Sequence, residues 1–219
     1  MTRKDLIAVV VPYRERFEPA FFMDNWLPLY ENRMNLDWCT LGIGKGLMND
    51  MPHVSAARNS LVVPALHRAA DYIYWLDADT VPRSPRSSVE ALRVLYEACK
   101  DEGFDIVSGL HLAKNTRQPC AYRLKEGRYK PVSLEEIGGN LYGVDAVGMG
   151  CCLMKAEVFG RVRSPWFKCD DQFEDYGEDV SFCRKAIEAG CGIYVHPGAV
   201  FGHLGIFMLT VEGSLEKPL

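Results

Sequence analysis

Residues 72–79 read Tyr-Ile-Tyr-Trp-Leu-Asp-Ala-Asp, five apolar residues that run directly into two aspartates. A short apolar run of this kind is typical of a strand buried on both faces. Ligand sites of open α/β sheets lie at the carboxyl ends of such strands. Asp77 and Asp79 would repel each other there, so a hard divalent cation bound through carboxylate oxygens is the expected compensation. The structural alternative is a solvated turn with a helix cap, because aspartate is common in both.

The first 110 residues around this stretch alternate expected strands and helices. The expected strands are 6–11, 38–43, 72–76 and 105–108, and the expected helices are 21–30, 54–70 and 88–100. Helix 88–100 carries one apolar stripe, with Ser87 and Glu90 at the positions of a capping box. The stripe consists of Val89, Leu92, Leu95, Tyr96 and Cys99. This alternation predicts an α/β fold with a mostly parallel central sheet flanked by helices.

Beyond residue 110 the pattern changes to shorter, Gly-rich strands, which predicts a smaller mixed C-terminal part. The expected strands are 121–124 and 129–132, joined as a hairpin, then 144–147, 151–154 and 192–195, with a helix at 178–189 and a Gly-rich tail at the end. No repeat or linker marks a boundary, so residues 1–219 are expected to form a single domain.

Composition sets further limits on the function. The chain has 219 residues, 48% of them hydrophobic, with 25 basic and 29 acidic side chains for a net charge of −4. The eight cysteines contain no C-x-x-C pair, and neither a signal peptide nor a membrane span is recognisable, so a soluble, reduced, cytoplasmic protein is expected. The acidic balance argues against bulk binding of nucleic acid.

A local basic patch lies between residues 114 and 130. It consists of Lys114, Arg117, Arg123, Lys125, Arg128 and Lys130. A solvated hairpin surface is the ordinary interpretation of such a run, and a nucleic-acid contact is left open.

Two motifs in the second half could complete a site with the aspartates. Glu178 and Asp179 open the last expected helix, where the helix dipole favours acids, but a carboxylate fixed there would also serve as a general base. His196 and His203 follow the last expected strand. They are either loop residues or an imidazole ligand that completes a metal site begun by the aspartates.

Two weaker motifs lie in the first half. Arg58 and Asn59 precede the Asp-x-Asp strand, and Arg58 could pair with phosphate or hold a carboxylate. Pro12, Tyr13 and Arg14 follow the first strand, where Tyr13 could stack on a base.

Taken together, these motifs resemble the GT-A class of glycosyltransferases, particularly family 2 and its relatives. The resemblance runs through residues 11–14, 57–59, 72–79, 148–154, 177–179 and 203, in that order along nearly the whole chain. It implies one Rossmann-like GT-A domain, with residues 1–110 as the nucleotide-sugar-binding half and residues 111–219 as the acceptor and catalytic half. It also implies a cofactor, Mn²⁺ or Mg²⁺, on the diphosphate of a nucleotide-sugar donor.

The resemblance assigns roles to individual residues. Asp79 would ligate the metal directly, Asp77 would contribute to the metal site and contact the ribose or sugar, and His203, or less favourably His196, would be the third ligand. Asp179 would be the base of an inverting reaction, with Glu178 orienting it or the acceptor. The expected donor contacts are Pro12, Tyr13, Arg14, Arg58, Asn59, Asp77, Gly148, Gly150 and Trp166.

Several choices stay open at this point. The acceptor is expected to be a saccharide or small alcohol, with a hydroxylated DNA base as a second hypothesis. Residues 41–46 lack the acid that reads the base in many family 2 chains, so the nucleotide is undetermined, as are a retaining outcome and the oligomeric state. One rival is a haloacid-dehalogenase-like phosphatase, with Lys168, Asp170 and Asp171 as its later lysine and acids. The other is a sugar-nucleotide-binding module without turnover.

Overall fold

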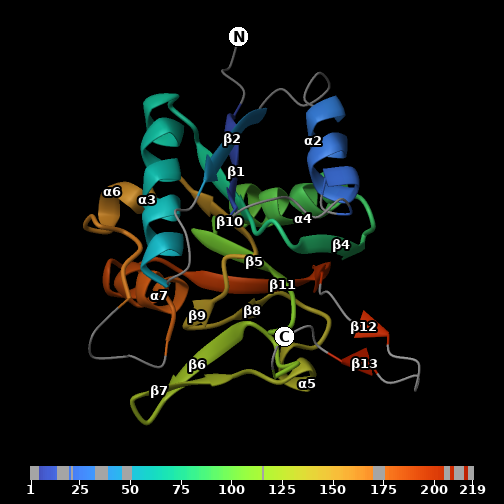
Figure 1. The fold of residues 1–219 in the computed structure, drawn as a ribbon. Coiled ribbons are helices and arrows are strands. Elements are labelled where there is room, and N and C mark those ends of the chain that lie inside the picture. Colours follow the sequence, from blue (N-terminus) through green and yellow to red (C-terminus); the bar gives the residue numbers. More distant parts are fainter. Residues whose placement is uncertain are drawn as a thin grey trace.

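A central sheet with helices packed against both faces organises the chain (Figure 1). The computed structural model describes residues 5–13, 20, 22–32, 39–45, 51–114, 116–169, 176–204, 208–209 and 215–216. In spatial order the strands are β2 (Cys39–Lys45), β1 (Ile7–Tyr13), β3 (Tyr72–Leu76), β10 (Cys151–Lys155), β5 (Ile106–Leu110), β11 (Ile193–His203) and β4 (Thr80–Ser84), with β8 (Tyr142–Gly143) paired to β11.

The sheet is mixed, so the expectation of a mostly parallel sheet is wrong. Strand β1 runs parallel to β2 and β3, and β11 runs parallel to β5. Strand β10 lies antiparallel between β3 and β5, and β11 pairs antiparallel with β4 and β8. A buried apolar run reads the same in either direction, so the sequence pattern could not reveal that β10 is inverted. Because β10 and β11 pair with β3, β4 and β5, strands from the two halves of the chain interleave.

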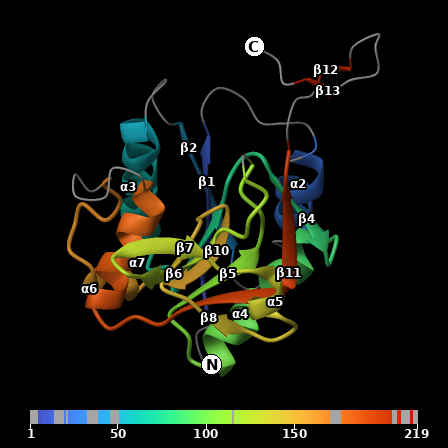
Figure 2. The same ribbon diagram turned by 90° about the horizontal axis from the view of Figure 1, so that it is seen from below.

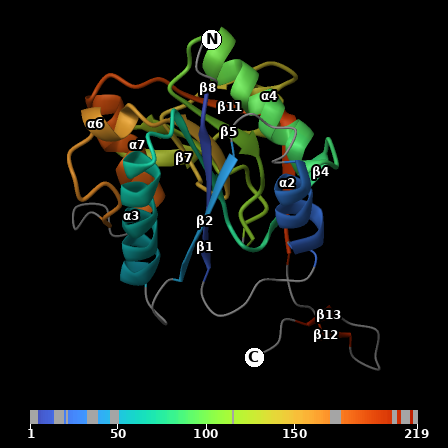
Figure 3. The same ribbon diagram turned by 90° about the horizontal axis from the view of Figure 1, so that it is seen from above.

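Successive side chains of a strand point to opposite faces of the sheet and are buried in two separate cores. In β1, Ala8 and Val10 join one core with α3 (Met51–His67), α6 (Val158–Arg161) and α7 (Glu178–Glu188). Ile7 and Val9 join the other core with α2 (Leu27–Asn32) and α4 (Ser88–Asp101). Figures 2 and 3 show these two groups of helices on either side of the sheet, seen nearly edge-on. A short π-helix, η1 (Phe22–Trp26), leads into α2.

Helix α4 forms as its sequence predicts. The Oγ atom of Ser87 accepts a hydrogen bond from the amide of Glu90 at 3.4 Å, which supplies the serine half of the expected capping box. Four residues of the stripe are buried and Tyr96 is partly buried. This helix is therefore positioned by the amphipathic face that the sequence displays.

The expected hairpin is confirmed as β6 (Ala121–Lys125) and β7 (Arg128–Pro131), and β9 (Ala146–Val147) adds a third strand. Its turn residues Glu126 and Gly127 both have positive φ, 55° and 75°, which matches the right-handed twist of a two-residue hairpin. Helix α5 (Leu134–Ile137) follows this small sheet with a full capping box between Ser133 and Glu136.

Two elements differ from the sequence-based expectation. Strand β4 was not expected, and β11 continues through His196 to His203 where a Gly-rich tail was expected. Pairing between β11 and β4 explains both, because each strand satisfies the backbone of the other. A last short pair, β12 (Met208–Leu209) and β13 (Leu215–Glu216), lies beyond β11.

No helix in the described part of the chain is long and apolar enough to cross a membrane. The described cysteines are free thiols: Cys99, Cys120, Cys151, Cys152, Cys169, Cys183 and Cys191. The core therefore forms without a disulfide among them.

Candidate functional site

The two aspartates lie on a tight turn between β3 and β4. The carbonyl of Gly150 accepts a hydrogen bond from the Asp77 amide at 3.0 Å and another from Thr80 Oγ1 at 2.8 Å. The Thr80 amide also closes the turn onto the Asp77 carbonyl at 3.0 Å. Both aspartate side chains are about one-third exposed, at 31% and 35%. The turn thus holds two carboxylates that are partly dry and still reachable from solvent.

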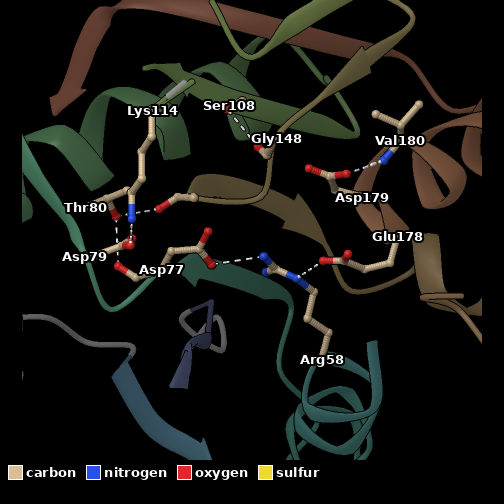
Figure 4. Close-up of polar contacts among 11 residues, drawn as sticks. Arg58, Asp77, Asp79, Thr80, Ser108, Lys114, Gly148, Glu178, Asp179 and Val180 are labelled. Carbon is tan, nitrogen blue, oxygen red and sulfur yellow. Dashed lines mark hydrogen bonds and ion pairs between the residues drawn. The ribbon is translucent and has the colours of Figure 1, made fainter. Parts of the chain in front are cut away.

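Arg58 joins Asp77 to Glu178 inside the molecule (Figure 4). Its Nη2 donates to Asp77 Oδ1 at 2.9 Å and its Nε to Glu178 Oε1 at 3.0 Å. The Arg58 side chain is 4% exposed, and its guanidinium lies 5.5 Å from the ring centroid of Trp75. Burial opposes its charge, but the neighbouring carboxylates together raise the pKa of Arg58. The sequence left open whether Arg58 binds a phosphate or a carboxylate, and in the structure it pairs with two carboxylates.

The surroundings of Asp79 differ from those of Asp77. Its carboxylate forms an ion pair with Lys114, whose side chain is 46% exposed. Its backbone carbonyl accepts a hydrogen bond from the Leu204 amide at 2.6 Å. Residues near 79 and near 203, far apart in sequence, therefore meet at this point.

His203 is the histidine that lies beside this turn. In the pairing of β11 with β4 it stands opposite Thr80, next to Asp79. Its Nδ1 lies 2.7 Å from the Leu112 carbonyl. If that nitrogen carries the proton, the lone pair of Nε2 is available to a metal. A backbone carbonyl bound to the other ring nitrogen commonly orients histidine ligands in this way. His196 stands opposite Gly109 in β5 instead.

The residue types at this turn are ones that bind divalent cations in proteins. The described residues contain no group of three or more His, Cys, Asp or Glu gathered as metal ligands. Asp77, Asp79 and His203 nevertheless offer carboxylate oxygen and imidazole nitrogen, which Mn²⁺ accepts, and Mg²⁺ usually takes only one or two carboxylates plus phosphate oxygens. Lys114 already supplies a positive charge at the Asp79 carboxylate. The residues present therefore fit a metal whose coordination a ligand phosphate completes.

Asp179 lies in the first turn of α7, across the site from Asp79 (Figure 4). Its Oδ1 accepts a hydrogen bond from the Val180 amide at 2.8 Å, and its other oxygen points toward the space above Asp77. A Cβ on Gly177 would come within 2.8 Å of Asp179 Oδ1, so glycine leaves room for this side chain. The pKa of Asp179 is raised to about 6: burial is the largest cause, the charge of Glu178 adds to it, and Arg58 opposes both.

The segment from Gly148 to Gly150 packs against a histidine that sequence reasoning missed. A Cβ on Gly148 would approach His111 Nε2 to 3.0 Å, and one on Gly150 would approach it to 3.2 Å. His111 follows β5 directly and is buried, and this burial lowers its pKa to about 4. The centroid of its ring lies 5.3 Å from that of His203. The rule that singled out Asp77, a polar residue at the carboxyl end of a buried strand, also applies to His111.

Other expected donor contacts have internal partners. Asn59 holds Phe167 through its Nδ2, at 2.7 Å from the Phe167 carbonyl, and through its Oδ1, at 3.1 Å from the Phe167 amide. Trp166 is half-buried and donates its Nε1–H to the Phe159 carbonyl at 2.9 Å. Pro12 lies near the end of β1, opposite Gly44. The donor roles of these residues stay predictions, and the Tyr13 side chain and Arg14 lie outside the described residues.

Four residues of the basic patch are paired with acids. Besides Lys114, the pairs are Arg123 with Asp145 at 3.5 Å, Lys125 with Glu136 at 4.0 Å and Lys130 with Glu126 at 3.2 Å. For Arg123, Lys125 and Lys130 this arrangement favours the solvated hairpin surface over a surface dedicated to phosphates.

Comparisons with known proteins relate the fold to a glycosyltransferase. The sequence matches no protein-family model and no curated protein. Among solved structures, the crystal structure of A197 from STIV aligns with a TM-score of 0.64 and 21% identity over 96% of this chain and 92% of that one. GalNAc-T7, crystallised with UDP, GalNAc and Mn²⁺, aligns with a TM-score of 0.54 and 13% identity over 93% of this chain and 44% of that one. At these identities the similarity concerns the fold, which is GT-A-like.

Proposed function

We propose that this protein is a metal-dependent glycosyltransferase that moves a sugar from a nucleotide-diphosphate sugar to an acceptor hydroxyl. The observation that carries the proposal is the link through Arg58, which holds Asp77 at 2.9 Å and Glu178 at 3.0 Å and so brings the Asp-x-Asp turn and the Asp179 helix to one site. The GT-A-like fold shared with GalNAc-T7 adds support.

Asp79, His203 and the free oxygen of Asp77 are the residues that would hold the metal. A bound Mn²⁺ or Mg²⁺ would neutralise the charge that grows on the leaving diphosphate. His203 is oriented for this by the Leu112 carbonyl at 2.7 Å from its Nδ1. Asp77 keeps one oxygen on the buried Arg58, whereas Asp79 is paired with the 46% exposed Lys114, so Asp79 is the carboxylate that a metal can reach at lower cost.

Asp179 is the proposed general base. One of its oxygens is fixed by the Val180 amide, so the other can take the proton of the acceptor hydroxyl. The hydroxyl oxygen would then form the bond to the anomeric carbon as the bond to the nucleoside diphosphate breaks. A pKa raised to about 6 makes it a stronger base than an ordinary aspartate while leaving it ionised at neutral pH. Glu178 is held by Arg58 and fixes the start of the helix that carries this base.

The first test identifies the donor. Thermal-shift measurements with a panel of nucleoside diphosphates and nucleotide sugars, each with and without Mn²⁺, should show one nucleotide that stabilises the protein only with the metal. Absence of any metal-dependent shift across the panel would contradict the proposed donor chemistry.

The second test concerns the base. With the donor known, Asp179→Asn should lower turnover by about 10² to 10⁴-fold while leaving donor binding nearly intact, because general-base catalysis contributes on that scale. Asp145→Asn, which changes a 32% exposed aspartate paired with Arg123 and with the Leu124 amide, is the matched control and should keep full turnover. Full activity of Asp179→Asn would show that the base assignment is wrong.

The acceptor is proposed to be a saccharide or small alcohol. A hydroxylated DNA base is the second hypothesis, and it requires affinity for DNA that falls steeply with salt. No structural observation favours the phosphatase: Asp77 is tied to Arg58, Lys168 is exposed, and Asp170 and Asp171 lie outside the described residues. Simple phosphate esters test that rival, and slow hydrolysis of the donor without acceptor separates an enzyme from a binding module.

A further inference from the structure

The ion pair between Lys114 and Asp79 has the properties of an exchangeable contact. The side chains are 46% and 35% exposed. Exposed ion pairs contribute little to stability, because solvent screens them and two long side chains must be ordered. Either partner can therefore be taken over by a competing ion at small cost.

Backbone hydrogen bonds hold the segment that carries Lys114 in place. Residues 111–114 and 116–120 are joined by backbone hydrogen bonds: the Cys120 amide donates to the His111 carbonyl at 2.9 Å, and the Ala113 amide donates to the Gln118 carbonyl at 2.8 Å. Leu112 pairs with Pro119 in a β-bridge, and its carbonyl also contacts His203. Lys114 can thus change partner by moving its flexible side chain, while these backbone contacts stay in place.

We propose that Lys114 is a phosphate-binding residue that shares Asp79 with the divalent metal. It pairs with Asp79 when no metal is bound, and when the metal takes that carboxylate its ammonium turns to the diphosphate of the donor. The inference rests on the proposed function, because it requires a diphosphate beside the metal-bound Asp79. An ammonium displaced from a carboxylate then finds phosphate oxygens, which accept strong charge-assisted hydrogen bonds.

The two roles predict effects of opposite sign in a single variant. Without Lys114, Mn²⁺ alone meets no competitor at Asp79 and binds more tightly. The complex of Mn²⁺ with a diphosphate loses a charged donor and binds more weakly. A residue with a merely structural role would shift both affinities in the same direction or neither.

The experiment compares Lys114→Gln with the wild type by calorimetry, using Mn²⁺ alone and then inorganic pyrophosphate in saturating Mn²⁺. Lys114→Gln should bind Mn²⁺ about two- to fivefold more tightly, the range of an exposed ion pair. It should bind pyrophosphate about tenfold more weakly, as expected for a hydrogen bond to a charged group. Lys130→Gln removes an equally exposed lysine, 52% exposed and paired with Glu126, and should change neither affinity.

The outcomes separate the two proposals. If the wild type binds Mn²⁺ and pyrophosphate but Lys114→Gln matches it in either affinity, the role of Lys114 is wrong and the proposed function stands. If the wild type binds neither probe, the metal-dependent function fails, and the role of Lys114 fails with it. Opposite shifts in Lys114→Gln, absent from Lys130→Gln, support the exchange.

Discussion

Asp77 and Asp79 lie two residues apart on one turn, yet their carboxylates are neutralised in different ways. Asp77 is held by Arg58, a 4% exposed guanidinium that also holds Glu178. Asp79 is held by Lys114, a 46% exposed ammonium at the surface of the site. The first pair forms a fixed internal support, and the second lies where a ligand can replace it. The comparison indicates that the turn combines a structural carboxylate with an exchangeable one.

The physical basis of the difference is solvent. A buried charge that loses its partner keeps the full cost of having left water, so a buried ion pair cannot be opened cheaply. An exposed charge that loses its partner is hydrated again, and the net change is small. The planar fork of arginine also suits two fixed carboxylates, whereas lysine is a point charge on a flexible stem.

The largest expected effect comes from removing the buried ion pairs of Arg58 with Asp77 and Glu178. Arg58→Met should lower the free energy of unfolding by about 3–5 kcal/mol, because Asp77 and Glu178 would remain partly or fully buried without a counterion. Lys114→Gln should lower it by less than about 1 kcal/mol. Urea unfolding of both variants measures the difference. The distinction drawn between the two pairs would be false if the two losses were equal.

A second effect concerns which aspartate binds the metal. Asp79→Asn should lower the affinity for Mn²⁺ by at least about tenfold, since even residues that only orient metal ligands have effects on that scale. Asp77→Asn should have the smaller effect on Mn²⁺, because Arg58 already occupies one of its oxygens at 2.9 Å. Calorimetric titration compares the two variants, and a larger loss in Asp77→Asn would reverse the assignment.

A third effect concerns the pKa of Asp179, on which the charges of Arg58, Asp77 and Glu178 act. The titratable and charged groups that interact with it are Glu178, Arg58, Asp77, Cys120, Tyr122 and Cys183. Because the base must be ionised, kcat/KM, which reports the ionisation of the free enzyme, should fall about tenfold per pH unit below the Asp179 pKa of about 6. Glu178→Gln removes a charge that raises this pKa and leaves Arg58 to lower it, so the acid limb should move to lower pH.

The matched control for that shift is Glu188→Gln, which changes an exposed glutamate of the same helix, paired with Arg184 at 3.2 Å. Its acid limb should coincide with that of the wild type. A limb that stays in place in Glu178→Gln, or moves to higher pH, would exclude the proposed influence of Glu178 on the base.

The smallest expected effect is the response to salt. The stability difference between Lys114→Gln and the wild type should shrink between about 0.05 M and about 0.5 M NaCl, because ions screen exposed charges. The difference for Arg58→Met should persist, because buried pairs are screened much less. Unfolding curves at the two salt concentrations test this. Equal salt dependence would show that the two pairs share one kind of environment.

Much of the fold followed from local patterns. The strand 72–76 and helix α4 are set by residues adjacent in sequence, through a short apolar run and an amphipathic stripe with its cap. The direction of β10 and the existence of β4 did not follow, because strand pairing is a contact between distant segments. The end of β11 was misread for the same reason: its glycines resemble a tail, and only the pairing of residues 200–203 with β4 makes it a strand.

The candidate site divides in the same way. Asp77, Asp79 and Asp179 were expected from their positions at the end of a buried run and the start of a helix. His111 was missed, although it also ends a buried strand, because its neighbours, the glycines before β10, are distant in sequence. Lys114 was expected only as part of the basic patch, because its contact with Asp79 joins distant segments.

By itself, the sequence determined which chemical groups the protein carries and which short segments form helices and strands, because propensity, periodicity and capping act over a few residues. Only the tertiary structure decided which cation each aspartate meets. Burial and the pairing of distant strands place Arg58 under the turn and Lys114 at its surface, and a side chain's distance from water depends on the whole chain.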